Sequence, residues 1–275
     1  MINSMKNVLV LATTFPRWEN DTEPDFVYSL SKLLTRDYNI HVLVPHFLRA
    51  KKFEKLGGLE IHRFAYFTEK LEKVCYDGGI LSNLQKNNIS KVGLPFLIIF
   101  EFLNTIKIVK KRKIDMIHAH WMLPQGFIAA IMKKIFKIPY VVSVHGGDIF
   151  PFRGSRFFKI FIRFVLRNCD FCTVNSTATK NAVLDVLEIN NIERIPMGVD
   201  LNSFNESKRD NSLKEDLGIE GEFLLSVGRI VKQKGINYLI EAMPEILEEF
   251  PKAKLIIVGD GNERENLEKL TKRLN

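Results

Sequence analysis

Short apolar runs alternate with amphipathic stretches along most of this chain. Runs of strand length occur at 7–12, 40–44, 115–119 and 141–144, and stretches with apolar residues at helical spacing lie between them. Apolar runs that are rich in β-branched residues are typical of parallel strands covered on both faces. The alternation predicts βαβ units and a mostly parallel sheet, so we expect an α/β fold.

The same pattern places the remaining elements of a first domain, which we expect to span residues 1–204. Further strands are predicted at 59–64 and 171–174, and helices at 25–36, 125–136, 155–167 and 177–187, with one more helix ending near Lys113. Ser176 is a suitable N-cap for the helix that begins after it. The stretch 69–90 has no clear period, and its glycine and asparagine pairs indicate loops.

A second α/β pattern follows the polar stretch 205–216, which we interpret as a linker. It predicts strands at 223–227 and 254–258 and helices at 236–249 and 263–274. Two such helices cannot cover both faces of a parallel sheet, because right-handed crossovers place them on the same side. We therefore expect residues 205–275 to form an incomplete second Rossmann-like domain. The chain would then be a truncated or split fragment that lacks a C-terminal half.

Two helices raise the question of membrane contact. The apolar run 92–103 is interrupted by Glu101 and is shorter than the roughly 20 residues that span a bilayer, so it predicts a core helix. The helix at 155–167 carries cations at spacings of three, four and four residues, namely Arg156, Lys159, Arg163 and Arg167. A basic stripe on an aromatic helix suits an anionic membrane interface, and it equally suits a core helix with one solvated face.

Composition narrows the class of protein. The 275 residues are 46% hydrophobic and 26% charged, as in ordinary soluble proteins, and they are enough for about two domains. A formal net charge of +8 favours anionic partners such as phosphorylated small molecules, an acidic membrane surface or nucleic acid. We expect no nucleic-acid binding, since the chain shows no recognition-helix signature and no interleaving of aromatic and basic residues.

Cysteine usage and the first residues indicate the compartment. Cys75, Cys169 and Cys172 are too few for a disulfide framework, and the last two form a Cys-x-x-Cys without the second pair that a zinc site needs. Buried thiols are therefore expected, and no metal site is predicted. The first six residues lead into a strand without a signal-peptide pattern, which favours a cytoplasmic location.

Residues 141–148 read Val-Val-Ser-Val-His-Gly-Gly-Asp, a buried strand that ends at His145. Gly146 and the glycine after it allow a tight turn and the close approach of another molecule. Ligands of open α/β sheets bind at the carboxyl ends of the strands, where His145 would lie. The alternative is a simple turn that carries a solvated histidine.

The stretch 228–235, Gly-Arg-Ile-Val-Lys-Gln-Lys-Gly, follows a predicted strand and opens into a helix. A helix N-terminus favours negative charge, and Arg229 and Lys234 can clamp a diphosphate there. Such loops also occur as solvated turns. The Val-Gly-Asp-Gly at 258–261 makes the combination more specific.

Five short motifs, taken in the order in which they occur along the chain, resemble those of the retaining GT-B glycosyltransferases of family 4. The matching stretches are His-Ala-His-Trp-Met-Leu-Pro-Gln-Gly (118–126), Val-His-Gly-Gly-Asp (144–148), Ile-Pro-Met-Gly-Val-Asp (195–200), Ser-Val-Gly-Arg through Lys-Gly (226–235) and Ile-Val-Gly-Asp-Gly (257–261). The resemblance runs from about Val8 to the last residue. It implies two Rossmann-like domains, the first for the acceptor and the second for a nucleotide-diphosphate sugar.

The resemblance also implies roles for individual residues. Gly228, Arg229 and Lys234 would bind the donor diphosphate, and His145 would assist at the reacting centre. His120, Gly146 and Asp148 would lie on the acceptor side, together with the loop 13–25. The sugar nucleotide would be a substrate, and the acceptor would be a glycan, a lipid-linked molecule or a small molecule. No cofactor is expected.

Two departures from the family pattern bear on these roles. Many relatives carry paired glycines in the loop after the first strand, where this chain has Asn-Asp-Thr-Glu-Pro at 20–24. The glutamate pair that holds the donor lies, in the family, beyond the Gly-Asp-Gly motif. We therefore expect half of a donor site and doubtful activity for this chain alone. The competing hypothesis is a non-catalytic module that binds an acceptor or a membrane surface and acts with a partner chain, peripheral on the inner membrane face.

Overall fold

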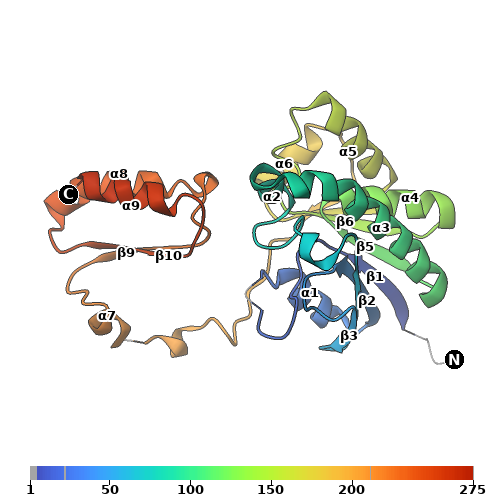
Figure 1. The fold of residues 1–275 in the computed structure, drawn as a ribbon, viewed down its shortest axis with the longest axis horizontal. Coiled ribbons are helices and arrows are strands. Elements are labelled where there is room, and N and C mark those ends of the chain that lie inside the picture. The colour runs from blue at the N-terminus through green and yellow to red at the C-terminus, as the bar shows by residue number, and fades with distance from the viewer. Residues whose placement is uncertain (1–4, 22, 211, 275) are drawn as a thin grey trace. The chain divides into compact units, whose positions relative to one another are not determined.

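A mostly parallel sheet forms the centre of the first part of the chain (Figure 1). In this computed structural model, which describes residues 5–21, 23–210 and 212–274, the strand order is β3-β4-β2-β1-β5-β6-β7-β8. Neighbouring strands are parallel except for β3 and β4. The strands are β1 (Lys6–Leu11), β2 (Tyr38–Pro45), β3 (Phe53–Leu56), β4 (Leu59–Phe64), β5 (Met116–His120), β6 (Tyr140–Val144), β7 (Phe171–Val174) and β8 (Ile192–Arg194). The predicted fold class is confirmed.

Helices cover the two faces of this sheet unequally. Val27 of α1 packs with Val8 and Val42 on one face, whereas the helices from α3 to α6 pack on the other face around Leu11 and Leu43. From β1 to β4 the chain adds strands toward one edge of the sheet, and from β5 to β8 it adds them toward the other edge. Right-handed crossovers then place the helices of the two halves on opposite faces. The helices are α1 (Phe26–Leu34), α2 (Ile80–Lys86), α3 (Asn88–Arg112), α4 (Phe127–Phe136), α5 (Arg156–Asn168) and α6 (Thr177–Leu184), with short turns η1 (Glu69–Leu71) and η2 (Met122–Gly126).

The structure adds elements that the apolar pattern did not indicate. β3 forms a hairpin with β4 across Gly57 and Gly58, whose φ angles of 58° and 84° suit glycine. Its four residues are half exposed and carry no apolar run. α2 lies in the unpatterned stretch 69–90, and the Asn87 side chain caps α3 by accepting a hydrogen bond from the backbone N–H of Ile89.

α3 differs in detail from the core helix expected at 92–103. It has 25 residues, and by length and composition alone it is apolar enough to cross a membrane. One face is buried against the sheet, and this face includes the fully buried Glu101. The apolar residues of its outer face are exposed, namely Val92, Phe96, Ile99 and Leu103. α3 is therefore a helix of the packed fold, as expected, but it is longer than the run 92–103 and its outer face is exposed.

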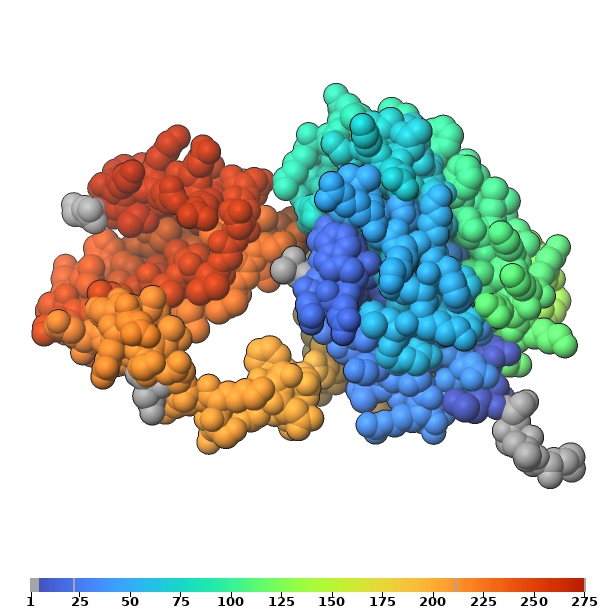
Figure 2. All heavy atoms as spheres, turned by 60° about the horizontal axis from the view of Figure 1, so that its bottom comes forward, coloured from blue at the N-terminus to red at the C-terminus, as the bar shows by residue number. Residues whose placement is uncertain are grey.

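The chain divides into two compact units, Met1–Gly198 and Val199–Asn275. Residues 193–210 are exposed throughout, and Figure 2 shows this yellow-orange stretch as a narrow band of spheres. Asn211 of the predicted linker and the first four residues, where no signal-peptide pattern was found, lie outside the described residues.

The second unit contains the predicted strands and helices. β9 (Phe223–Val227) and β10 (Lys254–Val258) pair in parallel. α8 and α9 lie on the same side of this pair, as right-handed crossovers require (Figure 1). Their small core includes Ile236, Ile240 and Leu267. The helical elements are η3 (Glu206–Lys208), α7 (Ser212–Asp216), η4 (Lys232–Lys234), α8 (Ile236–Glu249) and α9 (Arg264–Leu274).

Alternate side chains of β9 face away from this small core. Phe223 is 44% exposed, Leu225 58% and Val227 71%, and Val258 at the end of β10 is 50% exposed. These four side chains form an apolar face that no described residue covers fully. The expectation that one face of this sheet lies open is confirmed for the described residues.

The three cysteines are buried and free, as predicted. Burial raises the pKa of the Cys169 thiol to about 11. These thiols therefore remain protonated and unreactive at neutral pH.

Candidate functional site

His145 lies directly after β6, at the carboxyl edge of the sheet. Gly146 turns the chain with a φ of 91°, a value that side chains other than glycine rarely adopt. A Cβ at this position would also lie 3.3 Å from the ring of Phe150. The turn predicted from the two glycines is confirmed, but the histidine is half-buried and not the solvated side chain of the alternative hypothesis.

Asp148 holds the turn together. It is buried, and its two carboxylate oxygens accept backbone hydrogen bonds from His145 (3.0 Å) and Met122 (2.8 Å). Burial raises the pKa of Asp148 to about 6, although these backbone donors partly oppose the shift. Asp148 therefore joins two of the sequence motifs, and its carboxylate points inward.

Three histidines lie along this edge. Nδ1 of His120 is 3.0 Å from Nε2 of His145, and the two rings are stacked at 10°. His118 lies next in line, with its ring 4.3 Å from that of His120. Burial lowers the pKa of His118 and of His145 to about 4, and it lowers the pKa of His120 well below its usual value. All three rings are therefore neutral at pH 7.

Hydroxyl groups continue this polar row across the sheet. Nε2 of His118 lies 2.8 Å from the Ser143 hydroxyl, which lies 2.6 Å from that of Thr173. The three residues lie on β5, β6 and β7 in turn. Ser143 and Thr173 are register partners, whereas His118 lies two residues before His120, the register partner of Ser143 on β5. These contacts orient the ring of His118. No motif spacing in the sequence indicated that these three side chains would meet.

Trp121 forms an aromatic wall beside His145. Its ring lies 5.1 Å from that of His145, and the ring of Phe26 in α1 lies at the same distance on another side. The backbone of Trp121 has a φ of 75°, which costs a non-glycine residue roughly 1–3 kcal/mol. A hydrogen bond from its N–H to the Ser143 carbonyl holds it there (2.9 Å). Strain of this kind concentrates at functional sites.

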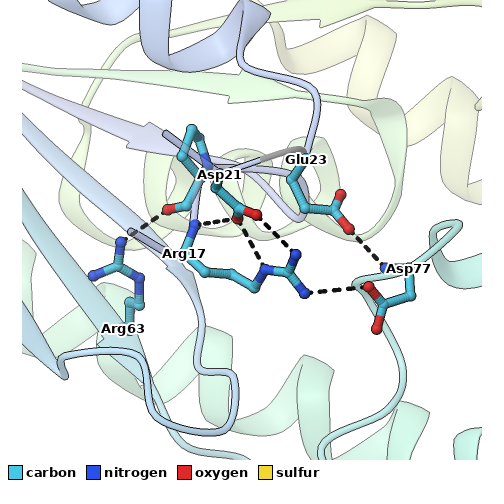
Figure 3. A network of polar contacts seen from close by, with 6 residues as sticks. Arg17, Asp21, Glu23, Arg63 and Asp77 are labelled. Carbon is cyan, nitrogen blue, oxygen red and sulfur yellow. Dashed lines mark hydrogen bonds and ion pairs between the residues drawn. The ribbon is translucent and has the colours of Figure 1, made fainter. Parts of the chain in front are cut away.

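The loop between β1 and α1 is held by a charged network (Figure 3). Arg17 forms two 2.8 Å contacts with the carboxylate of Asp21 and one of 3.2 Å with Asp77. Its guanidinium also lies 4.7 Å from the Trp18 ring and 4.6 Å from the Phe47 ring. Burial would raise the pKa of Asp21, but the hydrogen bonds from Arg17 outweigh it and lower this pKa to about 2.

Arg63 of β4 supports the same loop from below. Its guanidinium donates to the Pro16 carbonyl (2.9 Å) and pairs with Glu54 (2.7 Å). Beside the network lies a pocket of about 600 Å³, whose lining includes Arg17, Trp18 and Arg49. Ion pairs and hydrogen bonds therefore hold the described part of this loop where the family pattern has paired glycines; Thr22 lies outside the described residues.

A second set of predicted residues comes together in the second unit. Gly228 and Arg229 follow β9, and Lys234 ends the turn before α8. A Cβ on Gly228 would lie 4.0 Å from Cε of Lys234, so the lysine side chain lies across this glycine. Arg229 and Lys234 are exposed. This arrangement of glycine, two cations and a helix N-terminus suits an anion.

The Gly-Asp-Gly motif packs directly against this loop. A Cβ on Gly259 would lie 1.9 Å from the Gly228 carbonyl oxygen, and one on Gly261 would lie 2.1 Å from that of Ile230. The backbones can approach this closely only because both residues are glycines. Hydrogen bonds join the two segments, for example from the N–H of Ile230 to the Asp260 carbonyl (2.8 Å).

The structure thus gathers the predicted residues into two groups. His120, His145, Gly146 and Asp148 form one group in the first unit, and Gly228, Arg229 and Lys234 form another in the second. Reasoning from sequence missed Trp121, Phe26 and the Ser143–Thr173 pair. Only the Trp in the quoted 118–126 motif carried a signal that could have indicated one of them.

Comparison with known proteins agrees with these motifs. The profile described as Glycosyltransferase Family 4 matches residues 25–203, and that described as Glycosyl transferases group 1 matches residues 207–275. TuaC of Bacillus subtilis, named as a teichuronic acid biosynthesis glycosyltransferase, is 32% identical over 169 residues, which cover 59% of this chain and 42% of TuaC. Alpha-monoglucosyldiacylglycerol synthase of Acholeplasma laidlawii is 25% identical over 186 residues, covering 60% of this chain and 46% of the synthase.

Solved structures show the same fold. Sucrose-phosphate synthase from Thermosynechococcus elongatus superposes with a TM-score of 0.73 at 16% identity, covering 98% of this chain and 68% of the synthase. Anabaena HepE in complex with UDP-glucose has a TM-score of 0.66 at 18% identity, covering 98% of this chain and 66% of HepE. The chain spans about half the length of the curated relatives it matches. Since the family 4 profile matches more than half of the chain, the protein belongs to glycosyltransferase family 4.

Proposed function

We propose that this chain takes part in the transfer of a sugar from a nucleotide-diphosphate sugar to a glycan or lipid-linked acceptor, with retention of configuration. Retention is an expectation from the family resemblance. The observation that supports the proposal most is the loop 228–235, which the glycines of the Gly-Asp-Gly motif hold in place. HepE, a structural neighbour, is described in complex with UDP-glucose.

In the second unit, Arg229 and Lys234 would bind the two donor phosphates. The N-terminus of α8 adds free N–H groups and the positive end of its dipole. Charge builds up on the diphosphate as the sugar leaves, so these cations would stabilise the transition state as well as the bound donor.

In the first unit, His145 would hydrogen-bond to the transferred sugar. A pKa near 4 makes its imidazole a poor general base at neutral pH, because a catalytic base works best with a pKa near the operating pH. The resemblance to the retaining family 4 enzymes implies instead that the leaving phosphate accepts the acceptor's proton, so His145 need not be a base. Asp148 and His120 are buried, so they would position His145 without contacting the substrate, in place of the acceptor-side role that the resemblance implies.

The acceptor would lie along the loop between β1 and α1. Trp18 is 43% exposed beside Arg17, and its ring offers a flat apolar surface for a sugar. Arg49 and Lys51 also line the neighbouring pocket and would favour an acidic or phosphorylated acceptor.

Calorimetry with UDP tests the donor part of the proposal. UDP should bind this chain, and binding should weaken when Arg229 or Lys234 is replaced by alanine. Turnover of a panel of UDP- and GDP-sugars, followed by release of the nucleoside diphosphate, tests transfer. If neither UDP nor GDP binds at millimolar concentration, the donor assignment is wrong.

A second candidate function, membrane binding, rests on the side chains of α3, α4 and α5 that face away from the sheet. Apolar side chains on α3, α4 and α5 are exposed there, including Val92 (59%), Ile135 (55%), Phe157 (63%) and Ile160 (65%). Exposed cations lie among them, namely Lys91, Lys107, Lys134, Arg156 and Arg167. Such a surface suits an anionic membrane. α5 also buries Ile162, Val165 and Leu166, so one face of this helix belongs to the core and the membrane proposal concerns only its outer face.

A further inference from the structure

A group of potential metal ligands lies far from the carboxyl edge of the sheet, in the first unit. His41 is the fourth residue of β2, and Glu60 and His62 are the second and fourth residues of β4. β2 and β4 are neighbours, and their register places His41 directly beside Glu60. One ligand atom from each of the three side chains lies within 4.8 Å of the other two.

These three side chains share one face of the sheet. Leu43 and Phe64, which are two residues beyond His41 and His62 and therefore point to the same face, belong to the core under α3. Arg112, at the end of α3, reaches Glu60 from above (2.9 Å). His41, Glu60 and His62 therefore lie between the sheet and the last turn of α3, at the opposite edge from His145.

Three buried side-chain atoms of this group make no hydrogen bond with the described residues, although one of them, on Glu60, forms an ion pair with Arg112. They are Nδ1 of His41, Oε2 of Glu60 and Nε2 of His62. Nδ1 of His41 lies 3.2 Å from Oε2 of Glu60 without hydrogen-bond geometry. Buried polar atoms are normally satisfied, so two histidine nitrogens without a hydrogen bond beside a carboxylate call for a ligand.

We propose that His41, Glu60 and His62 bind a divalent metal ion of the zinc type. Two imidazoles and one carboxylate form a common ligand set for zinc, with the fourth position open. Ligand atoms of a tetrahedral zinc ion are about 3.3 Å apart, so the 3.2 Å pair already has the required spacing. The ligand atom of His62 lies within 4.8 Å of the other two and has to move closer to complete the site.

The competing interaction is the ion pairing of Glu60. Oε1 contacts Nζ of Lys55 (3.0 Å), and Oε2 contacts Arg112. A metal ion takes Oε2 and displaces the guanidinium, whereas Lys55 keeps its contact with Oε1. Arg112 is 32% exposed and lines a pocket of about 510 Å³ into which it can swing. The bound ion would clamp β2 to β4, a structural role separate from sugar transfer.

Zinc binding can be measured on the chain after treatment with a chelator. We expect one Zn²⁺ per chain by calorimetry, a zinc-dependent rise in the unfolding temperature that Mg²⁺ does not produce, and tetrahedral Co²⁺ absorption bands. His62→Ala should weaken zinc binding at least about 100-fold, since it removes a ligand. Glu60→Gln, which preserves size, should also weaken it if His62→Ala does not fold.

Two further variants distinguish a metal site from a structural ion pair and from zinc bound elsewhere on the chain. Arg112→Ala removes the competing cation and should tighten zinc binding, whereas loss of a merely structural ion pair would not. His145→Ala should leave zinc binding unchanged, because His145 belongs to the other histidine group. The proposal is overturned if the unaltered chain shows no zinc-dependent stabilisation, or if binding survives both His62→Ala and Glu60→Gln.

Discussion

Nδ1 of His120 lies 3.0 Å from Nε2 of His145, so one of these nitrogens donates a hydrogen bond to the other. Nε2 of His120 is buried without a partner among the described residues. An unpaired acceptor is more easily tolerated than an unpaired N–H, so His120 carries its proton on Nδ1 and donates. His145 is then protonated on Nδ1, and the tautomer of this half-buried histidine is set by the fully buried one.

The first prediction follows from this hydrogen bond. In a transferase-active form of the protein, His145→Ala should lower kcat by about 100-fold or more without unfolding the chain. His120→Asn keeps a donor near the position of Nδ1 and should retain activity that His120→Leu loses. NMR titration should show no protonation of His145 above pH 5, given its pKa of about 4. A measured pKa above 6 would contradict the hydrogen-bonding role and favour a general base.

The second prediction concerns the donor loop. Arg229→Ala or Lys234→Ala should weaken UDP binding by roughly 1.5–3 kcal/mol, because each removes a charge-assisted contact with phosphate. Lys252 is a matched control, since it is exposed, pairs with Glu220 and precedes β10 at the opposite edge. Equal effects of Lys252→Ala and Lys234→Ala would mean that only net charge matters.

The third prediction concerns Glu101, which is fully buried and accepts hydrogen bonds from the Gln125 amide (3.1 and 3.2 Å). Burial raises its pKa to about 8 in the folded chain, from 4.5. The folded state then holds its proton more tightly than the unfolded state. Its contribution to the free energy of unfolding is complete below about pH 4.5 and is lost as pH rises to about 8.

Glu101→Gln should therefore stabilise the first unit at pH 8 by a few kcal/mol, since each pKa unit is worth about 1.4 kcal/mol. Both tryptophans, Trp18 and Trp121, lie in this unit, so fluorescence-detected urea unfolding reports on it selectively. Glu69→Gln, at an exposed carboxylate, is the control. If the two variants show the same pH dependence as the parent chain, Glu101 is ionised in the folded state.

The fourth prediction concerns membrane binding by the side chains of α3, α4 and α5 that face away from the sheet. The chain should bind vesicles that contain anionic lipid, and binding should fade as salt rises. Replacing Phe157 and Ile160 by serine should weaken it at least about tenfold, because exposed apolar anchors are lost. Leu33→Ser alters an equally exposed side chain on α1, across the sheet, and should have no effect. Equal partitioning onto neutral and anionic vesicles would contradict this prediction.

The fifth prediction concerns local stability. Amides of β9 and β10 should exchange with solvent faster than those of β1, β5 and β6, which are covered on both sides by partner strands. β9 and β10 pair only with each other among the described strands, and one face is exposed. Hydrogen exchange with mass spectrometry measures this directly. Protection across β10 equal to that of β1 would show that the second unit is as stable as the first.

The sequence alone determined the fold class and most elements. Apolar runs such as 7–12 and 141–144 became β1 and β6, because a strand buried on both faces must be apolar throughout. Glycine-bearing motifs at 145–148 and 228–235 marked the two groups of site residues, since a tight turn leaves a trace in residue type. β3 left no such trace, because its short hairpin is half exposed.

Only the tertiary structure decided which face each side chain takes and which residues meet. Glu101 interrupts an apolar run, yet it is the buried residue, because its position on α3 faces the sheet while Ile99 and Leu103 face outward. His41 meets Glu60 and His62 only through the register of β2 and β4. Contacts between residues far apart in sequence depend on strand order and register, and no local pattern of residues encodes these.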